Sequence, residues 1–136
     1  MKLFITAFGN KVFALDRTTG QIRWRVMLGG KYELATVVEI AIDDDTVIVC
    51  TPNRLGIIDY ASGELRKEIL RGDATKSAPR PTMVIDGKQI FIAGVGVLSC
   101  YTTQGELVWD QPFKGEGYGA ISMGLPGNVR QADDTD

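Results

Sequence analysis

The sequence of 136 residues contains no histidine. Without histidine it cannot build a Ser-His-Asp or Cys-His nucleophilic site, a zinc site that depends on imidazole, or an imidazole proton shuttle. An excess of one charge is lacking as well, because 15 Lys and Arg stand against 17 Asp and Glu. A net charge of −2 provides no field that would attract nucleic acid or an anionic membrane, so we expect neither as a partner.

Cysteines and long apolar segments are also scarce. Cys50 and Cys100 each lie inside an apolar run. We expect two buried, reduced thiols, with a disulfide as the alternative that a cytosolic chain rarely keeps. The apolar run from Leu3 to Phe8 is too short for a secretion signal. No segment approaches the roughly 20 apolar residues of a membrane span, so the sequence predicts a cytoplasmic protein without membrane insertion.

Three segments of the chain repeat one pattern of apolar residues around a turn glycine. They align without gaps on Gly20, Gly63 and Gly105, at spacings of 43 and 42 residues. Trp24 and Trp109 occupy the same position after the glycine in the first and third copies. A period of this length indicates a repeat architecture, in which each repeat packs against its neighbours.

The residues before each glycine predict a tight turn. Asp16 and Asp59 precede the glycine by four residues, so their carboxylates can accept hydrogen bonds from the turn backbone. The glycine itself can adopt positive φ at low cost. The third copy has Tyr101 in place of the aspartate, and its turn is expected to lack the side-chain bond.

Each repeat predicts four short strands. Ile22, Trp24 and Val26 alternate with arginines, which is typical of a half-exposed strand. The two strands before the turn are apolar on both faces and must be covered on both sides. One further strand is predicted in each connection between copies, at 36–42 and at 81–85. Four strands in about 42 residues indicate the blade of a β-propeller, and therefore an all-β fold.

The segment Phe13-Ala-Leu-Asp16, followed by Gly20 and Trp24, resembles the PQQ-like (quinoprotein) β-propeller repeat. The second copy keeps Asp59 and Gly63 but has Lys67 where the tryptophan would stand, and the third copy keeps Gly105 and Trp109. The resemblance covers residues 1 to about 124. It implies the propeller fold but no single activity, because such repeats serve dehydrogenases, outer-membrane assembly scaffolds and binding proteins. WD40 proteins share the architecture but match the sequence less well.

Quinoprotein dehydrogenases bring a catalytic Asp, a Ca²⁺ held by Glu, Asn and Asp, and often adjacent cysteines. No such set lies on matching positions here. Asp43, Asp44 and Asp45 lack the ligand spacing of a calcium loop and predict a polar hairpin turn instead. We therefore expect no catalytic residue, no metal and no cofactor, and hence no enzyme.

Three blades are too few to close a ring, since propellers have four or more. The first copy lacks a first strand, and residues Tyr118 to Met123 have a strand pattern. We expect residues 1–124 to form three four-stranded antiparallel blades that close into a six-bladed propeller as a homodimer, strand 118–123 of one chain completing the first blade of the other. Another oligomer, a heteromeric assembly and a fragment of a larger propeller are the alternatives. Residues 125–136 end acidic and predict a flexible tail, with an ordered extension across the ring or a docking peptide as the alternative.

Loops that join successive blades crowd one end of a propeller, which is a natural place for recognition. The candidate binding residues in these loops are Lys31, Tyr32, Lys76, Arg80, Glu116 and Tyr118. Both tryptophans are expected to pack between blades, with ligand stacking as the alternative. Basic residues on the outgoing strands or just past them are expected to lie at a solvated outer edge, with a basic rim for an acidic partner as the alternative; they are Arg23, Arg25, Arg66, Lys67 and Arg71.

The sequence thus predicts a non-enzymatic scaffold or protein–protein interaction module that binds itself and another protein through its loops. The alternative is a propeller that binds a small molecule or cofactor, for which polar and aromatic groups would have to converge at the ring axis.

Overall fold

The computed structural model describes residues 2–31, 33, 38–76 and 81–132, and all regular structure in them is antiparallel β. Blade 1 consists of β1 (Leu3–Phe8), β2 (Lys11–Asp16) and β3 (Ile22–Met27). Blade 2 consists of β4 (Glu39–Asp43), β5 (Thr46–Cys50), β6 (Arg54–Asp59) and β7 (Leu65–Leu70). Blade 3 consists of β8 (Thr82–Asp86), β9 (Gln89–Ala93), β10 (Leu98–Thr102) and β11 (Leu107–Gln111). β12 (Met123–Leu125) and β13 (Asn128–Arg130) form a separate hairpin.

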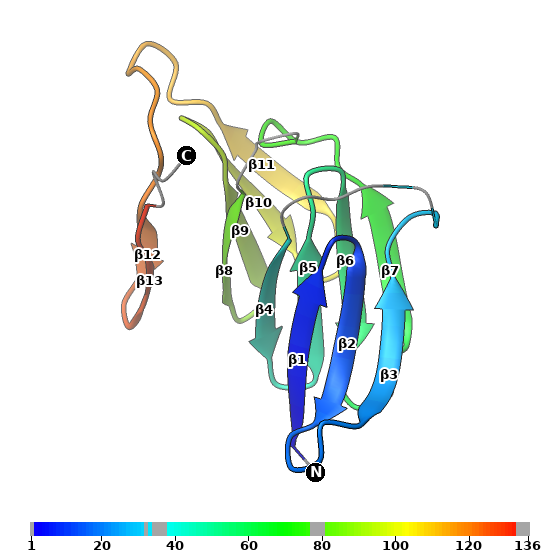
Figure 1. The fold of residues 1–136 in the computed structure, drawn as a ribbon. Coiled ribbons are helices and arrows are strands. Elements are labelled where there is room, and N and C mark those ends of the chain that lie inside the picture. Colours follow the sequence, from blue (N-terminus) through cyan, green and yellow to red (C-terminus); the bar gives the residue numbers. More distant parts are fainter. Residues whose placement is uncertain (1, 32, 34–37, 77–80, 133–136) are drawn as a thin grey trace.

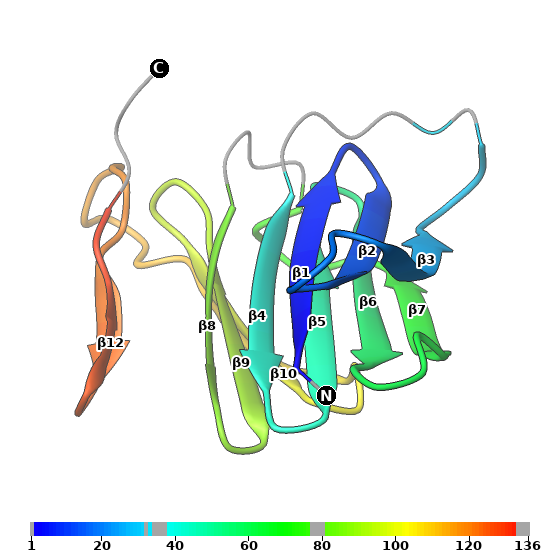
Figure 2. The same ribbon diagram turned by 60° about the horizontal axis from the view of Figure 1, so that its bottom comes forward.

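The three blades stand side by side with their faces together (Figures 1 and 2). The middle blade is covered on both faces because side chains alternate along its strands. Val47 and Val49 of β5 belong to the apolar cluster with blade 1, whereas Ile48 and Cys50 belong to the cluster with blade 3. This explains the continuous apolar sequence of β5, and it confirms that the repeats fold as stacked propeller blades.

The turn between the last two strands of each blade is confirmed. In blade 1 the Asp16 carboxylate accepts a hydrogen bond of 2.8 Å from the Thr18 amide, and Gly20 has a φ of +78°. In blade 2 the Asp59 carboxylate accepts a hydrogen bond of 2.9 Å from the Ser62 amide, the equivalent of the bond from the Thr19 amide to Asp16. The third turn was expected to lack a side-chain bond, and this is wrong, because the Thr102 hydroxyl accepts hydrogen bonds from the amides of Gln104 and Glu106.

Successive blades meet at one repeated contact. A Cβ on Gly63 of blade 2 would lie 2.6 Å from the ring of Trp24 in blade 1, so this position requires glycine. The Trp24 Nε1–H donates to the Tyr60 carbonyl at 2.9 Å. Lys67 takes the place of the tryptophan between blades 2 and 3, where a Cβ on Gly105 would lie 3.1 Å from its Cδ. Trp24 is therefore an inter-blade residue, as predicted.

The C-terminal segment departs from the prediction. Residues 118–122 are not in a strand, and the strand begins at Met123. The segment 125–136, expected to be a flexible tail, contains β13. The Asn128 side-chain amide donates to the Ile85 carbonyl of β8 at 2.8 Å, and Arg130 pairs with Glu39 of β4 at 3.0 Å. These contacts hold the hairpin against β8 of blade 3 and β4 of blade 2 in its own chain, which a pattern read along the sequence could not reveal.

Candidate functional site

The loops that follow β3, β7 and β11 lie at the same end of the blade stack, which we call the loop end (Figures 1 and 2). Among the candidate residues, Lys31, Lys76, Glu116 and Tyr118 are described there, and all four are exposed. Tyr32 and Arg80 lie outside the described residues. The loop end is thus the common location of the predicted binding residues that can be placed.

A buried charged cluster supports the β7–β8 loop. Arg71 immediately follows β7, and its guanidinium forms two hydrogen bonds of 3.1 Å with the Asp73 carboxylate, both side chains being fully buried. The Tyr101 hydroxyl donates to Asp73 at 2.5 Å, and Thr75 contacts both Arg71 and Asp73. We call these four residues the Arg71 cluster. It joins residues 71–75, which follow blade 2, to β10 of blade 3, so this described start of the loop is tied to the next blade.

The environment fixes the charges in this cluster. Burial by itself would raise the pKa of the Asp73 carboxyl, but hydrogen bonds from Arg71, Thr75 and Tyr101 outweigh it and hold that pKa far below its usual range. Burial and the hydrogen bond to Asp73 raise the pKa of Tyr101. The tyrosine therefore stays a donor, and the aspartate stays an ionised acceptor.

The Arg71 cluster was not anticipated, because Arg71 was predicted to lie at the solvated edge. That prediction is wrong: Arg71 is 1% exposed. The signal was present in the repeat, since Arg71 falls at the position of Leu28 in the first copy, which is fully buried. An arginine at a buried repeat position needs an acid nearby, and Asp73 stands two residues later.

A second charged group supports the loop between blades 1 and 2. Arg54 of β6 contacts Glu33 at 2.8 Å and Glu68 at 2.6 Å. The Glu68 carboxylate also accepts from the Gly29 amide at 3.1 Å. The hydrogen bond from Arg54 lowers the pKa of Glu33. Both loops are therefore anchored by ion pairs at their bases.

A groove of about 690 Å³ opens at the loop end between the β9–β10 loop and the segment after β11. Val95, Phe113 and Tyr118 are among the residues that line it, and they are 53%, 39% and 92% exposed. Phe113 has a φ of +48°, a conformation that costs a bulky residue energy and that occurs often at functional sites. We call this the loop groove.

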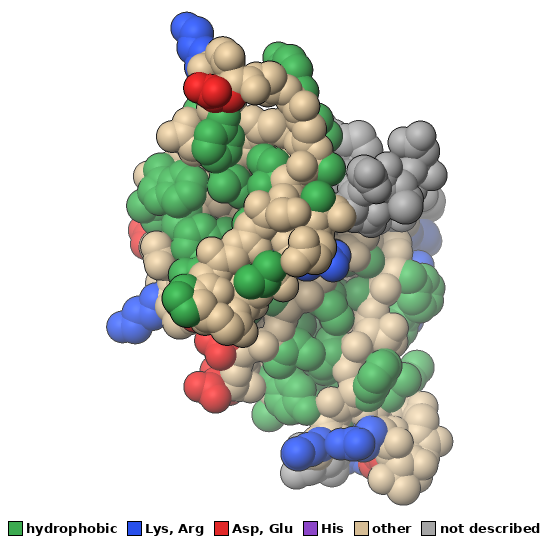
Figure 3. Space-filling model, turned by 90° about the vertical axis from the view of Figure 1, so that its left-hand side faces the viewer, with side chains coloured by type: hydrophobic (Ala, Val, Ile, Leu, Met, Phe, Trp, Pro, Cys, Tyr) green, Lys and Arg blue, Asp and Glu red, His purple; other side chains and the backbone are tan. Residues whose placement is uncertain are grey.

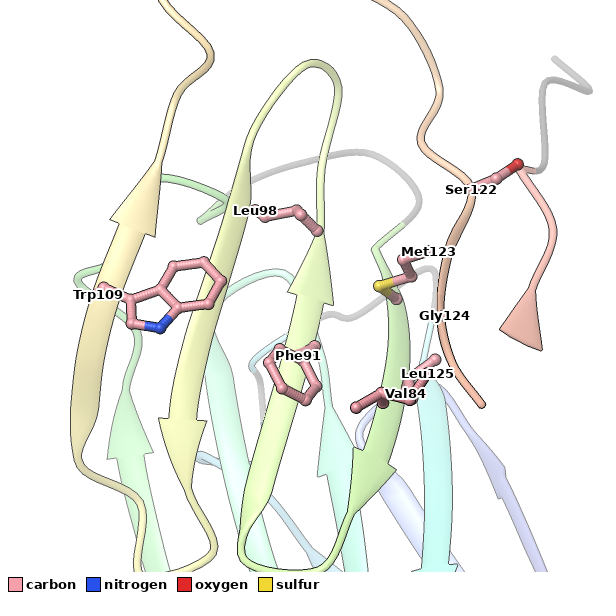
Figure 4. Close-up of a pocket in the computed structure, with 8 residues that line it drawn as sticks. All are labelled: Val84, Phe91, Leu98, Trp109, Ser122, Met123, Gly124 and Leu125. Atoms are coloured by element: carbon pink, nitrogen blue, oxygen red, sulfur yellow. The ribbon is translucent and has the colours of Figure 1, made fainter. Parts of the chain in front are cut away.

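A second pocket, of about 300 Å³, lies between β12 and the face of blade 3 that points away from blade 2. Figure 4 shows Trp109 on β11, Phe91 on β9, and Met123 and Leu125 on the hairpin beside Val84. Trp109 is 39% exposed, and its ring lies 6.2 Å from that of Phe91. Trp109 thus packs against no following blade among the described residues.

The other buried polar groups and the cysteines offer no further candidate site in the described residues. In the part of the chain that the structure describes, every buried side-chain nitrogen and oxygen has a hydrogen-bond partner. Cys50 and Cys100 are free and buried, as predicted, and burial raises the pKa of Cys50 to about 12. Over these described ranges no helix is long and apolar enough to span a membrane, and no group of three or more acidic or cysteine side chains is placed to bind a metal.

Solved structures share the fold at low sequence identity. AztD from Citrobacter koseri superposes with a TM-score of 0.63 at 17% identity over 88% of this chain and 34% of its own. The Pan2 WD40 domain from Neurospora crassa gives 0.54 at 14% identity, over 82% of this chain and 35% of its own. A protein of unknown function from Bacteroides caccae superposes with a TM-score of 0.52 at 16% identity, over 78% of this chain and 39% of its own. The chain spans little more than a third of these proteins.

No curated protein matches the sequence. A family model described as outer membrane protein assembly factor BamB, built on PQQ-type repeats, matches residues 2–78. This is more than half of the chain, and it includes the turns at Gly20 and Gly63 and the Trp24 contact between them. The chain therefore belongs to this PQQ-like β-propeller repeat family.

Proposed function

We propose that the chain is a non-enzymatic scaffold that binds another protein at its loop end. The observation that carries this proposal is the loop groove beside a rigidly anchored loop base. Exposed Val95, Phe113 and Tyr118 supply apolar and aromatic contact area, which interfaces favour. The ion pairs of Arg71 and Arg54 hold Asp73 and Glu33 at the bases of two loops, and they reduce the entropy that these residues would lose on binding.

The family name gives this proposal a direction. The matched model is described as an outer membrane protein assembly factor, which is a role in protein assembly. The Arg71 cluster and the ion pairs of Arg54 support the same role, because these charged side chains pair with one another and position backbone segments at the loop end. The alternative of small-molecule binding would use the apolar pocket at Trp109. The lining of this pocket offers few polar groups for orienting a ligand, so the scaffold function is favoured.

Site-specific photocrosslinking in cells tests the loop groove. Benzoylphenylalanine in place of Tyr118 or Phe113 should give a crosslinked band with the same partner protein from both positions. The matched control is Lys88, an exposed residue in the β8–β9 turn at the opposite end, which should give no such band. Equal crosslinking from Lys88, or no protein crosslink from either groove position, would contradict the proposal.

We also propose the cytoplasm as the compartment of this chain. The two free, buried cysteines support it, since reducing compartments keep thiols unpaired. Cell fractionation with thiol labelling of the denatured protein tests the proposal. Recovery in an envelope fraction would overturn it.

A further inference from the structure

The blade stack ends in two apolar faces. On blade 1, Phe4 and Phe8 are 59% and 61% exposed, and the Phe8 ring stacks on Phe13 at 5.4 Å. On blade 3, the face lined by Val84, Phe91, Leu98 and Trp109 is open at the second pocket. Figure 3 shows hydrophobic side chains gathered on this side of the molecule around the hairpin. Apolar faces of this kind mark sites of association.

The inter-blade contact inside the chain indicates what these two faces fit. Each turn glycine receives a side chain from the preceding blade: Gly63 receives Trp24, and Gly105 receives Lys67. By this rule Trp109 should pack on the turn glycine of a following blade, and Gly20 should receive a side chain from a preceding one. In this structure a Cβ on Gly20 would meet nothing within 4 Å among the described residues, and Trp109 is partly exposed.

We propose that a second copy of this chain docks head to tail, with Trp109 of one copy packed on Gly20 of the other. The contact continues the interface already present between blades 1 and 2, including a hydrogen bond from the indole N–H to the Arg17 carbonyl, the equivalent of Trp24 to Tyr60. The pairing is reciprocal: the blade 3 face of each copy would cover the blade 1 face of the other. Two copies would therefore leave neither face exposed and would close a six-bladed ring. This proposal rests on the scaffold function and names its first partner.

The hairpin and β1 supply the second half of the same interface. The Tyr60 hydroxyl bonds to both the Leu3 amide and the Leu3 carbonyl, so these backbone groups point away from β2. Antiparallel pairing alternates, and Ile5 and Ala7 therefore present theirs at the same edge. β12, rather than β13, lines the pocket over blade 3. β12 would pair with the edge of the other copy's β1 and provide the fourth strand of that blade, which replaces the predicted role of residues 118–123.

The mass of the purified 136-residue chain tests the docking directly. Light scattering after size exclusion should give about twice 14.8 kDa. Trp109→Ala removes an aromatic anchor and should weaken dimerisation by roughly 30-fold or more. Gly20→Asn tolerates positive φ but fills the space that the indole needs, and it should have the same effect. Gly87→Asn, at a φ of +60° in open space, is the matched control and should stay dimeric.

Mixing the two variants separates docking from folding. A mixture of Trp109→Ala and Gly20→Asn retains one intact Trp109–Gly20 pair, so a one-to-one dimer should form although each variant alone is monomeric. A native chain with the mass of a single copy would overturn the proposal. So would a dimer that both variants leave unchanged, or a mixture that stays monomeric. These results concern the mass of the pure chain, so crosslinking at Tyr118 tests the scaffold function independently.

Discussion

At the scale of single residues, buried charge does the most to fix the structure around the loop end. A buried ion pair contributes little to stability by itself, but an unpaired buried charge is costly. Arg71 depends on Asp73 for this reason, and Asp73 depends in turn on Tyr101 and Thr75. The four residues act as a unit, so their substitutions should not be additive.

Removing one member of the Arg71 cluster should therefore be severe. Asp73→Asn should lower the free energy of unfolding by about 3–5 kcal/mol, because it leaves the Arg71 guanidinium buried without a counter-charge. Tyr101→Phe removes one hydrogen bond to Asp73 and should cost about 1–3 kcal/mol. Urea denaturation followed by circular dichroism measures both values. If Asp73→Asn lowered the free energy of unfolding by less than Tyr101→Phe does, the result would contradict the role of the ion pair.

Asp73 also predicts how stability depends on pH. Its folded pKa lies below the ordinary value of 3.8, so its contribution is complete well above pH 3.8 and is lost as the pH falls through the folded pKa. In that range the unfolded state binds more protons than the folded state. Urea titrations at a series of acidic pH values should show the native chain losing stability more steeply than Asp73→Asn. Parallel curves would be inconsistent with a depressed pKa.

Substitutions at two turn glycines can distinguish the cost of backbone strain from the cost of inter-blade packing. Gly63→Ala should cost about 1–3 kcal/mol from overpacking against Trp24, in addition to about 1–2 kcal/mol for the left-handed conformation. Gly87→Ala has the same backbone requirement but open space, so it should show the second cost alone. Thermal unfolding of the two variants gives the comparison. Equal midpoints would mean that Trp24 does not require glycine at position 63.

At the scale of elements, the hairpin β12–β13 is held differently from the blades. Its contacts with the rest of the chain include the Asn128–Ile85 hydrogen bond, the Arg130–Glu39 ion pair and apolar packing at Val84. The inner blade strands β5, β6, β9 and β10, in contrast, pair on both edges and bury most of their side chains. The hairpin should accordingly be the part of the structure that detaches most easily.

Removal of residues 123–136 tests this difference. The shortened chain should unfold cooperatively with a midpoint within a few degrees of the native one at low protein concentration. It should bind more of the dye ANS, because Val84 and Phe91 lose the cover of Met123 and Leu125. Loss of a cooperative transition would show that the hairpin is part of the core.

At the scale of the whole molecule, the chain is a stack in which each blade depends on its neighbours. The middle blade is covered on both sides, and the terminal blades on one. In such arrays stability is close to a sum of repeat and interface contributions. The protection of backbone amides should follow this order.

Hydrogen exchange with mass spectrometry provides the measurement. Amides of β5 and β6 should exchange most slowly, since residues such as Val49 and Ile58 are fully buried. The outer strands β3, β7 and β11 should exchange faster. Slower exchange in β11 than in β5 would contradict the order.

Much of the fold followed from local patterns. The turn residues Asp16 and Gly20 act within five positions of one another, and the apolar faces of β2 and β5 follow from alternation, so both were predictable. The burial of Arg71 was not, because its partners Asp73 and Tyr101 come together only when blades 2 and 3 stack. The groove at Phe113 and Tyr118 also required the structure, since its walls come from separate loops.

The sequence by itself determined the repeat, the turn chemistry and the membership of the PQQ-like family, because these depend on residue types at short, regular spacing. Tertiary structure alone decided which arginine is buried, where the C-terminal hairpin lies and which tryptophan packs on the turn glycine of a following blade. Those features depend on contacts between residues far apart in the chain, and such contacts are set by how the blade faces pack. Trp24 and Trp109 show the difference most clearly. They occupy the same position in the repeat, but within the described chain only Trp24 is followed by a blade whose turn glycine, Gly63, it can pack on.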